Sequence, residues 1–347
     1  MKTPWLVIRS QRWPISLRFN RKLPGLLLLL GLLVLLATVI SVGYGEYEIS
    51  PLAVTKILLG FADVDSTDAF TIYTLRLPRI LLAFLVGVGF AIAGTIIQGI
   101  TQNPLAAPGI IGVNAGASLA AVILLVLVPN APVYALPLAA FLGAFIVTIL
   151  IYLLAWKDGS SSQRLILVGV GFSLIATALT NILTTFGPIE LVSQALFWLT
   201  GSVYGSSWED VFTLLPWISI FGFFSFSLAS ELNTLSLGDE IACSLGAHLE
   251  WHRGILVFIS VALSGAAVAA AGSIGFVGLM TPHLARQLVG PRHQELLPTA
   301  ALLGGLLVVL ADAIGRLLFM PIELPCGVVT AAIGAPYFLY LFIQKRR

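Results

Sequence analysis

Long apolar runs recur along the whole chain and dominate its pattern. Each run is about 18 to 25 residues long, the length that an α-helix needs to cross the hydrocarbon core of a bilayer. The runs lie at 24–42, 78–100, 107–128, 132–156, 165–186, 211–230, 254–271, 273–290, 296–318 and 325–343. The pattern predicts an all-α polytopic membrane protein with ten transmembrane helices in a single domain over 1–347. A further apolar stretch around 190–203 predicts a short re-entrant or surface helix.

The composition excludes a soluble globular protein. Hydrophobic residues make up 58% of the 347 residues and charged residues only 10%, whereas a soluble domain carries about 25% charged residues. The net charge of +2 carries little information by itself. The placement of the charges is informative, because basic residues concentrate on the cytoplasmic side of membrane proteins.

The basic residues fix a predicted orientation. If both termini are cytoplasmic, 14 of the 18 Lys and Arg residues lie in inner segments, and only Lys56, Arg76, Arg79 and Arg316 lie outside. This asymmetry predicts a multi-pass protein of the cytoplasmic membrane with an outer loop at 43–72. The run that begins at Leu26 is too long for a signal-peptide core and lacks a clear cleavage site, so we assign it to the first span.

Several kinds of chemistry are missing from the sequence. There is no GxxxxGK[ST] phosphate loop, so ATP hydrolysis would need a separate subunit. Asp312 is the clear acid within a span, and its spacing from Arg316 predicts a local ion pair. His248 and His252 lack a third ligand nearby in the sequence, so we predict no metal site. Ser, His and Asp are too sparse at recognisable spacings to suggest hydrolysis, so we predict no catalytic residues. We also expect no nucleic-acid partner.

Small residues and cysteines add two expectations about packing. Gly87 with Ala91, and Gly265 with Ala269, repeat at a spacing of four and predict close helix contacts. Cys243 lies in a predicted inner loop and Cys326 near the outer end of the last span. On this topology the two thiols cannot meet in a disulfide.

A cytoplasmic segment at 232–250 has its own pattern. Leu237, Ile241, Leu245 and Leu249 recur every four residues, which predicts one apolar helical face, while Asp239 and Glu240 suit the start of a helix. Gly238 and Gly246 are expected to break or end short helices. The alternative is an amphipathic helix that rests on the membrane surface.

Three motifs resemble a known family. They are "YTLRLPRILLAFLVGVGFAIAGTIIQGITQNPLAAPGIIGVNAGAS" at 73–118, "GSIGFVGLMTPHLARQLVG" at 272–290 and "ADAIGRLLFMPIELPCGVVTAAIGAPYFLYLF" at 311–342. In these motifs the chain resembles the FecCD-type permease subunits of type II ATP-binding-cassette (ABC) importers, which take up iron–siderophore complexes, cobalamin or haem. The resemblance implies a second permease subunit, two cytoplasmic ATPases that use ATP and Mg, and an extracytoplasmic binding protein. It implies no cofactor on this chain.

The resemblance also implies roles for particular positions. Arg76, Arg79 and Arg316 match the outer arginines that contact the binding protein, and the alternative is that they anchor helix ends at the membrane surface. The segment 232–250 matches the coupling segment that presses into the ATPase, with the candidate contacts Leu237, Gly238, Asp239, Ile241, Leu245 and Gly246.

A gate and a pathway wall are expected around the fifth span. In "DGSSSQR", Ser161 and Ser162 match the region of the inner gate, and a flexible polar turn is the alternative. The small residues of the fifth span predict the wall of the translocation pathway, and they are Gly169, Gly171, Ala176 and Thr177.

The resulting expectation is a permease that moves an iron–siderophore-type chelate by alternating access. A cobalamin or haem importer is the nearest alternative. A secondary transporter without ATP coupling, or a channel, would not need the segment at 232–250.

Overall fold

Long helices account for most of the structure. The computed structural model describes residues 5–9, 16–45, 47–61, 66–156, 161–318 and 322–344. Within these residues, seven helical stretches are long and apolar enough to cross a membrane, and each overlaps a predicted span. They are α1 (Leu23–Gly43), the stretch Thr67–Thr101, α6 (Ala135–Ala155), α7 (Ser162–Phe186), α9 (Trp208–Ser227), α12 (Leu249–Ala271) and α14 (His293–Leu317).

Shorter segments fill the remaining predicted spans and the connections. The third, eighth and tenth predicted spans contain η2 (Pro108–Ile111) with α5 (Val113–Leu127), α13 (Val277–Val289) and α15 (Cys326–Gln344). The short helix predicted around 190–203 is confirmed as α8 (Ile189–Leu199). The connections hold α2 (Pro51–Leu58), α10 (Ala229–Leu235) and α11 (Asp239–Ser244).

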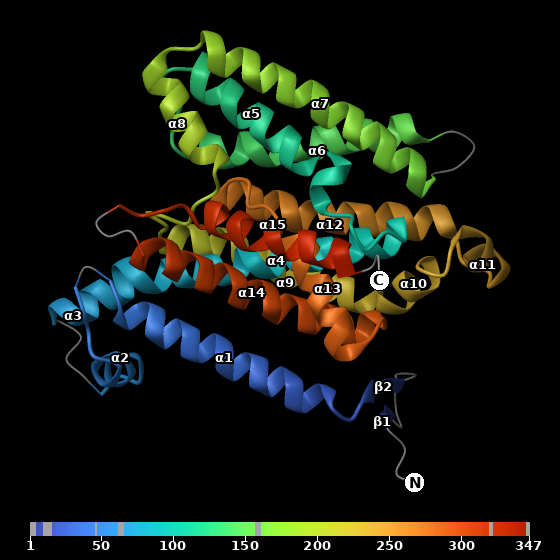
Figure 1. The fold of residues 1–347 in the computed structure, drawn as a ribbon, viewed down its shortest axis with the longest axis horizontal. Helices are drawn as coiled ribbons and strands as arrows, with labels where there is room; N and C mark the ends of the chain where they lie inside the picture. Colours follow the sequence, from blue (N-terminus) through green and yellow to red (C-terminus); the bar gives the residue numbers. More distant parts are fainter. Residues whose placement is uncertain are drawn as a thin grey trace.

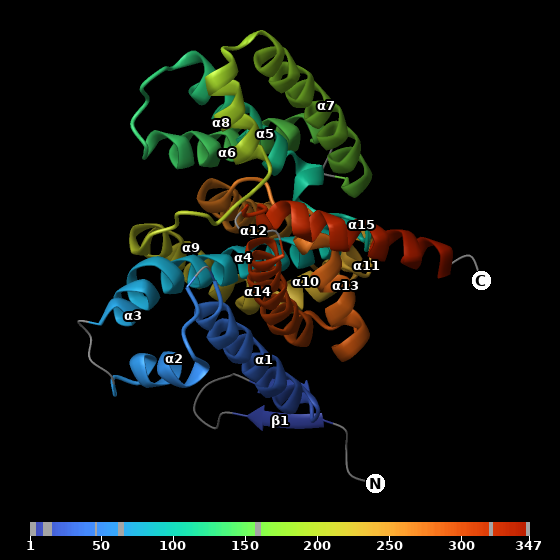
Figure 2. The ribbon, with the colours of Figure 1, turned by 60° about the vertical axis from the view of Figure 1, so that its left-hand side comes forward.

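The helices run side by side along the long axis of the molecule (Figure 1). α4 (Leu77–Thr101) lies at the centre and contacts α9, α12, α13 and α14, while α1 packs against the far side of α14. The helices α5 to α8 form a separate layer that joins the rest mainly through α12 (Figure 2). We call the two ends of the bundle the α3 end, where α2 and α3 (Thr67–Phe70) lie, and the α11 end, where α10 and α11 lie.

Glycines allow α4 to approach its neighbours at backbone distance. A Cβ added to Gly87 would lie 2.2 Å from the carbonyl oxygen of Gly304, and one added to Gly94 would lie 1.8 Å from that of Gly278. Gly304 in turn faces Gly87 and Ala91, so the predicted close contact at these positions is confirmed. Gly265 differs, because a Cβ there would meet only ordinary contacts at 3.5 Å or more.

The helix of the second span begins earlier than predicted. Pro78 does lie in the first turn of α4, but α3 (Thr67–Phe70) and the π-helical turn η1 (Thr71–Arg76) lead into it without a break. Proline cannot donate the usual helical hydrogen bond. The N–H of Leu77 reaches back to the carbonyl of Ile72, so the wider π turn accommodates the ring.

Two helices begin inside the bundle, which the sequence did not predict. The eighth predicted span is not one helix from residue 273, because residues 272–275 have no regular secondary structure and Phe276 has φ 66 before α13 starts. α5 likewise starts only after Gly112, with φ 83, and Ile110 lies against Gly169 well inside α7. Both breaks need positive φ, which ends the preceding hydrogen-bond pattern.

The all-α prediction also missed a hairpin before the first span. β1 (Trp5–Arg9) and β2 (Ser16–Asn20) pair antiparallel in a two-stranded sheet. The N–H of Asn20 donates to Glu295 Oε1 at 2.9 Å, which ties the hairpin to the start of α14. The strands are too short to show a clear periodicity in the sequence.

We expect the Gly94→Ala substitution to destabilise the bundle, because the methyl group would collide with the Gly278 backbone. Overpacking of this kind costs about 1–3 kcal/mol or more. The measurement is the thermal unfolding midpoint of the detergent-solubilised protein. Gly171→Ala in α7 is the matched control, since a Cβ there has no atom within 4 Å. Equal midpoints for the two variants would contradict the packing shown here.

Candidate functional sites at the two ends of the bundle

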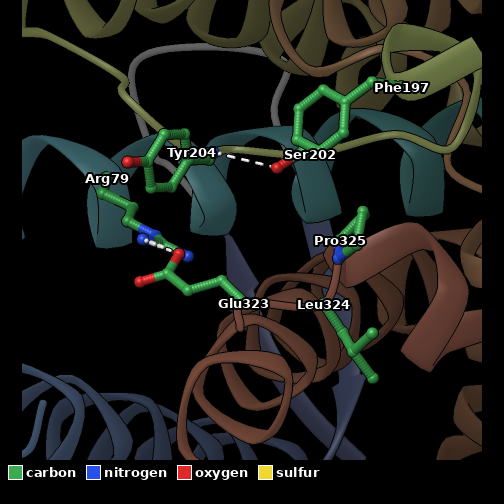
Figure 3. Close-up of a pocket in the computed structure, with 7 residues that line it drawn as sticks. All are labelled: Arg79, Phe197, Ser202, Tyr204, Glu323, Leu324 and Pro325. Atoms are coloured by element: carbon green, nitrogen blue, oxygen red, sulfur yellow. Dashed lines mark hydrogen bonds and ion pairs between the residues drawn. The ribbon is translucent and has the colours of Figure 1, made fainter. Parts of the chain in front are cut away.

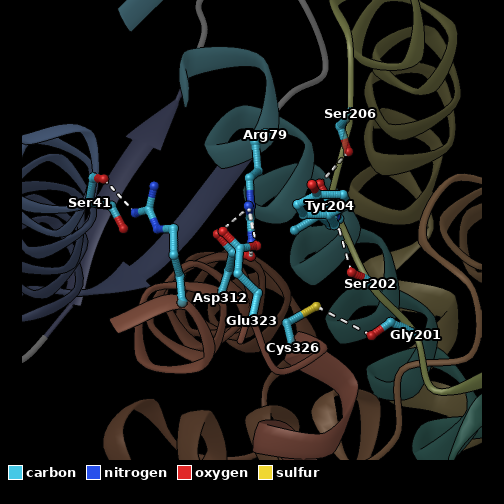
Figure 4. Close-up of polar contacts among 11 residues, drawn as sticks. Ser41, Arg79, Gly201, Ser202, Tyr204, Ser206, Asp312, Glu323 and Cys326 are labelled. Atoms are coloured by element: carbon cyan, nitrogen blue, oxygen red, sulfur yellow. Dashed lines mark hydrogen bonds and ion pairs between the residues drawn. The ribbon is translucent and has the colours of Figure 1, made fainter. Parts of the chain in front are cut away.

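Arg79 is the centre of a buried charge cluster at the α3 end. Its guanidinium donates to both carboxylate oxygens of Asp312 and lies 2.8 Å from Asp312 Oδ1. Its Nη1 also lies 2.8 Å from Glu323 Oε2. Figure 4 shows Arg79 between these two acids, with Asp312 on α14 and Glu323 in the segment before α15. The cluster therefore joins α4, α14 and the α14–α15 connection.

Arg76 and Arg316 cap the last turn of α1. Nη1 of Arg76 donates to Val42 O at 2.6 Å, and its Nη2 donates to Tyr47 O. Nη2 of Arg316 donates to Ser41 O at 2.5 Å. The last carbonyls of a helix have no partner within the helix and carry its negative dipole end. Both guanidinium groups therefore stabilise the position where α1 ends.

Glycine at position 45 makes room for this cap. A Cβ at Gly45 would lie 2.9 Å from Arg76 Nη2. In the same loop, the Asp68 carboxylate accepts a hydrogen bond from the Tyr47 hydroxyl and raises the pKa of that phenol. The described part of the loop at 43–72 is thus folded onto the bundle.

One expectation about these charges needs correction. Asp312 does not pair with Arg316 one turn away but with Arg79, 233 positions earlier in the sequence. All three arginines are buried. They are buried because Arg76 and Arg316 hydrogen-bond carbonyl groups at the end of α1 and Arg79 pairs with the buried carboxylate of Asp312.

A cavity of about 250 Å³ opens beside Arg79. Tyr204, Ser202 and Phe197 line one side of it, and Glu323, Leu324 and Pro325 line the other (Figure 3). The Arg79 guanidinium carbon lies 5.6 Å from the centre of the Tyr204 ring, within the range of a cation–π interaction. Arg79 and Glu323 of the charge cluster therefore both border this cavity.

At the α11 end, the segment 232–250 presents apolar side chains to the outside. Leu237 is 55% exposed, Ile241 50% and Leu245 64%. Only Ile241 lies within α11, because Gly238 (φ 108) and Gly246 (φ 81) interrupt the helical path. The expected single face of four residues is wrong, since Leu249 begins α12 and packs against the core. The predicted glycine breaks are confirmed.

Long-range contacts that the sequence did not reveal hold this segment in place. Asp239 accepts a hydrogen bond from the fully buried Arg253 at 2.6 Å, which joins α11 to α12. Asn233 Oδ1 accepts from the His293 backbone N–H at 2.9 Å and lies 2.8 Å from His293 Nδ1, which joins α10 to α14. The partners in each pair are too far apart in the sequence for the spacing of residues on a helix or strand to predict the contact.

The residues expected at the gate and pathway do not form one surface. Ser162 donates to Ile100 O at 2.8 Å, so it packs the start of α7 onto α4, and Ser161 is the N-cap residue of α7. Asp158, Gly159 and Ser160 of the same motif lie outside the described residues. Gly169 and Ala176 are buried, whereas Gly171 and Thr177 are exposed on other sides of α7. The expected small-residue face is therefore wrong, because these positions fall at different angles around the helix.

Metal-binding side chains do not gather in threes anywhere among the described residues. Cys243 is exposed, Cys326 is buried, and both are free thiols. The sites described above therefore consist of charge pairs, helix caps and apolar contacts.

The fold and these two sites define a polytopic transport protein of the membrane. Comparison with known proteins gives the family, since the FecCD transport family model matches residues 32–344. The chain belongs to the FecCD transport family. It is a multi-pass permease subunit of an ABC importer, a component of a larger complex, and not itself an enzyme.

Individual relatives cover most of the chain. The chain is 44% identical to the Fe(3+)-citrate import system permease protein YfmE of Bacillus subtilis, over 92% of this chain and 95% of that protein. It is 46% identical to the siderophore transport system permease protein YfhA of the same organism, over 89% and 91%. A solved inward-facing structure of a metal-chelate type ABC transporter is similar with a TM-score of 0.84 and 35% identity, over 92% of this chain and 99% of that one.

We expect Arg79→Ala to destabilise the protein strongly, because it leaves Asp312 buried without its cation. Removing one partner of a buried ion pair costs about 3–5 kcal/mol. Glu323→Gln is the control, since its side chain is 29% exposed and can hydrate. The measurement is the unfolding midpoint in detergent. A loss for Arg79→Ala no larger than for Glu323→Gln would show that the buried pair does not stabilise the α3 end.

Proposed function

We propose that this permease imports an iron(III) chelate of the citrate or siderophore type by alternating access, driven by separate ATPase subunits. The observation that carries the ATP-driven mechanism is the exposed segment 232–250, where three large apolar side chains face away from the bundle. The cargo assignment is supported by relatives more than 40% identical to this chain, whose names state iron(III) citrate or siderophore transport. Cobalamin and haem are the competing cargoes.

We further propose ten spans with the α11 end in the cytoplasm. The described basic residues Arg9, Arg18, Arg21, Lys22, Arg164 and Arg292 belong to segments at that end. This distribution follows the positive-inside rule. The two interrupted spans, which contain α5 and α13, cross the membrane with their helix and a non-helical segment together. A second permease subunit completes the transporter, and this chain binds no cofactor of its own, since ATP and Mg are used by the ATPase.

The coupling segment is proposed to dock on the ATPase through Leu237, Ile241 and Leu245. These side chains would lose their contact with water in a groove of the partner, and each fully buried Leu or Ile contributes about 1.5–3 kcal/mol. Asp239 and Asn233 then connect the docked segment to α12 and α14 through Arg253 and His293. A movement of the ATPase would reach the membrane helices by these two contacts.

The α3 end is proposed to receive the binding protein. Arg76, Arg79 and Arg316 place three positive charges together there, and the acids Asp312, Glu323 and Asp68 interact with them. Carboxylates of the binding protein would compete with these acids for the guanidinium groups. At the cavity beside Arg79, an incoming carboxylate would take the place of Glu323, which is the more exposed of the two acids.

We expect the double variant Ile241→Glu/Leu245→Glu to bind its ATPase subunit no longer and to lose transport activity. The reason is that two carboxylates would have to enter an apolar groove of the ATPase. The measurements are retention of the ATPase subunit on purification and ATP-driven uptake into vesicles. Leu59→Glu is the matched control, since Leu59 is a leucine of similar exposure (69%) near the other end of the bundle.

The same uptake assay decides the cargo. We expect saturable, ATP-dependent uptake of ferric citrate or a ferric hydroxamate by the parent protein, and none of cobalamin or haem. If the Ile241→Glu/Leu245→Glu variant retained the ATPase subunit fully, the segment 232–250 would be only a surface helix. Uptake of cobalamin or haem alone would overturn the cargo assignment.

We expect Arg76→Gln/Arg316→Gln to weaken binding of the binding protein, because the double substitution removes two positive charges from the α3 end. Arg76→Lys/Arg316→Lys keeps the charges and should bind more tightly than the Gln pair. High salt should reduce binding of the parent toward that of the Gln pair. Lys56→Gln is the control for an outer charge outside the cluster, and unfolding midpoints are measured on the same samples. Unchanged affinity in a folded Gln variant would exclude electrostatic docking.

A further inference from the structure

The hairpin of β1 and β2 is amphipathic. Its register pairs Leu6 with Phe19 and Ile8 with Leu17. Successive residues of a strand belong to opposite faces of a sheet, and directly paired residues share a face. These four positions therefore form one face that is wholly apolar. The other face holds the alternate positions, which are Trp5, Val7, Arg9, Ser16, Arg18 and Asn20.

The connection to α1 brings this hairpin to the membrane surface. Only Arg21 and Lys22 separate β2 from α1, and both are exposed. Only 17% of the most apolar window of α1 is buried in the bundle, the smallest share among the seven long stretches of the described residues. Lipid therefore surrounds most of this helix. The β1 arrow turns across the end of α1 and does not continue its axis (Figure 2).

The charges of this segment have one sign. The hairpin and its connection to α1 carry Arg9, Arg18, Arg21 and Lys22, and the first 45 residues of the sequence contain no Asp or Glu. The carboxylate that accepts the Asn20 N–H belongs to Glu295, which is 1% exposed and so adds little negative charge to the surface. A basic cluster that directly flanks a transmembrane helix attracts anionic lipid headgroups.

We propose that the hairpin, together with Arg21 and Lys22, is an anchor for anionic phospholipid. Its apolar face enters the boundary between headgroups and acyl chains, and its basic residues neutralise headgroup phosphates. Segments that lie in the membrane interface combine an apolar face with Lys and Arg in this way. Lipid is favoured over a soluble protein as the occupant, because the lipid around α1 continues to the base of the hairpin. The proposal depends on α1 as a span, and not on the proposed cargo or ATPase contact.

The first measurement tests whether the apolar face enters lipid. Ser16 and Leu17 are neighbours on opposite faces of β2, so Leu17→Cys and Ser16→Cys form a matched pair. In a Cys243→Ser background, which removes the exposed native thiol, each carries a bimane fluorophore on the assembled transporter in vesicles. Phospholipids with bromine near the headgroup end of their chains quench a fluorophore on contact. We expect them to quench at Leu17→Cys about twofold more than at Ser16→Cys.

The second measurement tests the charge of the bound lipid. Leu29 and Leu36 of α1 are 53% and 54% exposed. They lie about two turns apart on the same side of the helix, one near the hairpin and one far from it. The vesicles contain equal parts of phosphatidylglycerol and phosphatidylcholine, and either lipid carries the bromine. We expect brominated phosphatidylglycerol to quench bimane at Leu29→Cys about twofold more than brominated phosphatidylcholine, and both to quench equally at Leu36→Cys.

Substitutions of the basic residues connect this lipid preference with the hairpin. Arg18→Gln/Arg21→Gln/Lys22→Gln should make the two lipids quench equally at Leu29→Cys. Arg18→Lys/Arg21→Lys retains the charges and should keep the preference for phosphatidylglycerol. Both variants are compared as assembled transporters, so a loss of folding is detected before the lipid measurement.

Either measurement can overturn the proposal. Equal quenching at Leu17→Cys and Ser16→Cys means that water or protein covers the apolar face. No preference for phosphatidylglycerol at Leu29→Cys, or a preference that survives the triple Gln substitution, refutes the binding of anionic lipid by these residues. Absence of quenching at Leu36→Cys would refute α1 as a span, and the proposal with it. Chelate uptake is measured separately, so the proposed cargo is decided independently.

Discussion

The close contact of α4 with α13 and α14 is the constraint on which the rest of the structure depends. Inside a bilayer the apolar faces of helices gain nothing by leaving lipid, so association depends on the fit of their surfaces. Gly87 and Gly94 let the α4 backbone touch the backbones of Gly304 and Gly278. The same helix carries Arg79 at one end, and at the other Gly99 packs against Leu232 of α10 and His293 of α14. α4 therefore connects the charge cluster with the helices that hold the segment 232–250.

The buried charges at the α3 end have a structural role that precedes any contact with a partner. Arg76 and Arg316 satisfy carbonyls at the end of α1, and Arg79 neutralises Asp312. A docking partner could interact with this cluster only by competing with groups that already hold it. Glu323 is the group most open to such competition, since it borders the cavity and is the least buried member of the cluster. Binding of a partner at the α3 end and the stability of that end would then both depend on Arg79.

The sequence predicted where helices lie better than how they end and what they contact. Apolar runs identify segments because burial in lipid is a property of each segment alone, and the ten predicted runs all contain helices. The partner of Asp312 could not be predicted, because Arg316 satisfied the local spacing rule while Arg79 became adjacent only through folding. For the same reason the contacts of Asn233 and Arg253 were missed. The apolar spacing of four at 237–249 was misleading, because positive φ at Gly238 and Gly246 redirects the chain.

The helix breaks inside the bundle explain why its polar residues gather where they do. α5 and α13 both start inside the bundle, after backbone turns that leave N–H groups without helical partners. Asn114, at the start of α5, hydrogen-bonds Ser273 in the non-helical segment before α13, so the two breaks lie side by side. Burying two such breaks separately in an apolar bundle would leave each with unpaired groups. Placing them together lets polar groups of one break pair with those of the other, as Asn114 and Ser273 do.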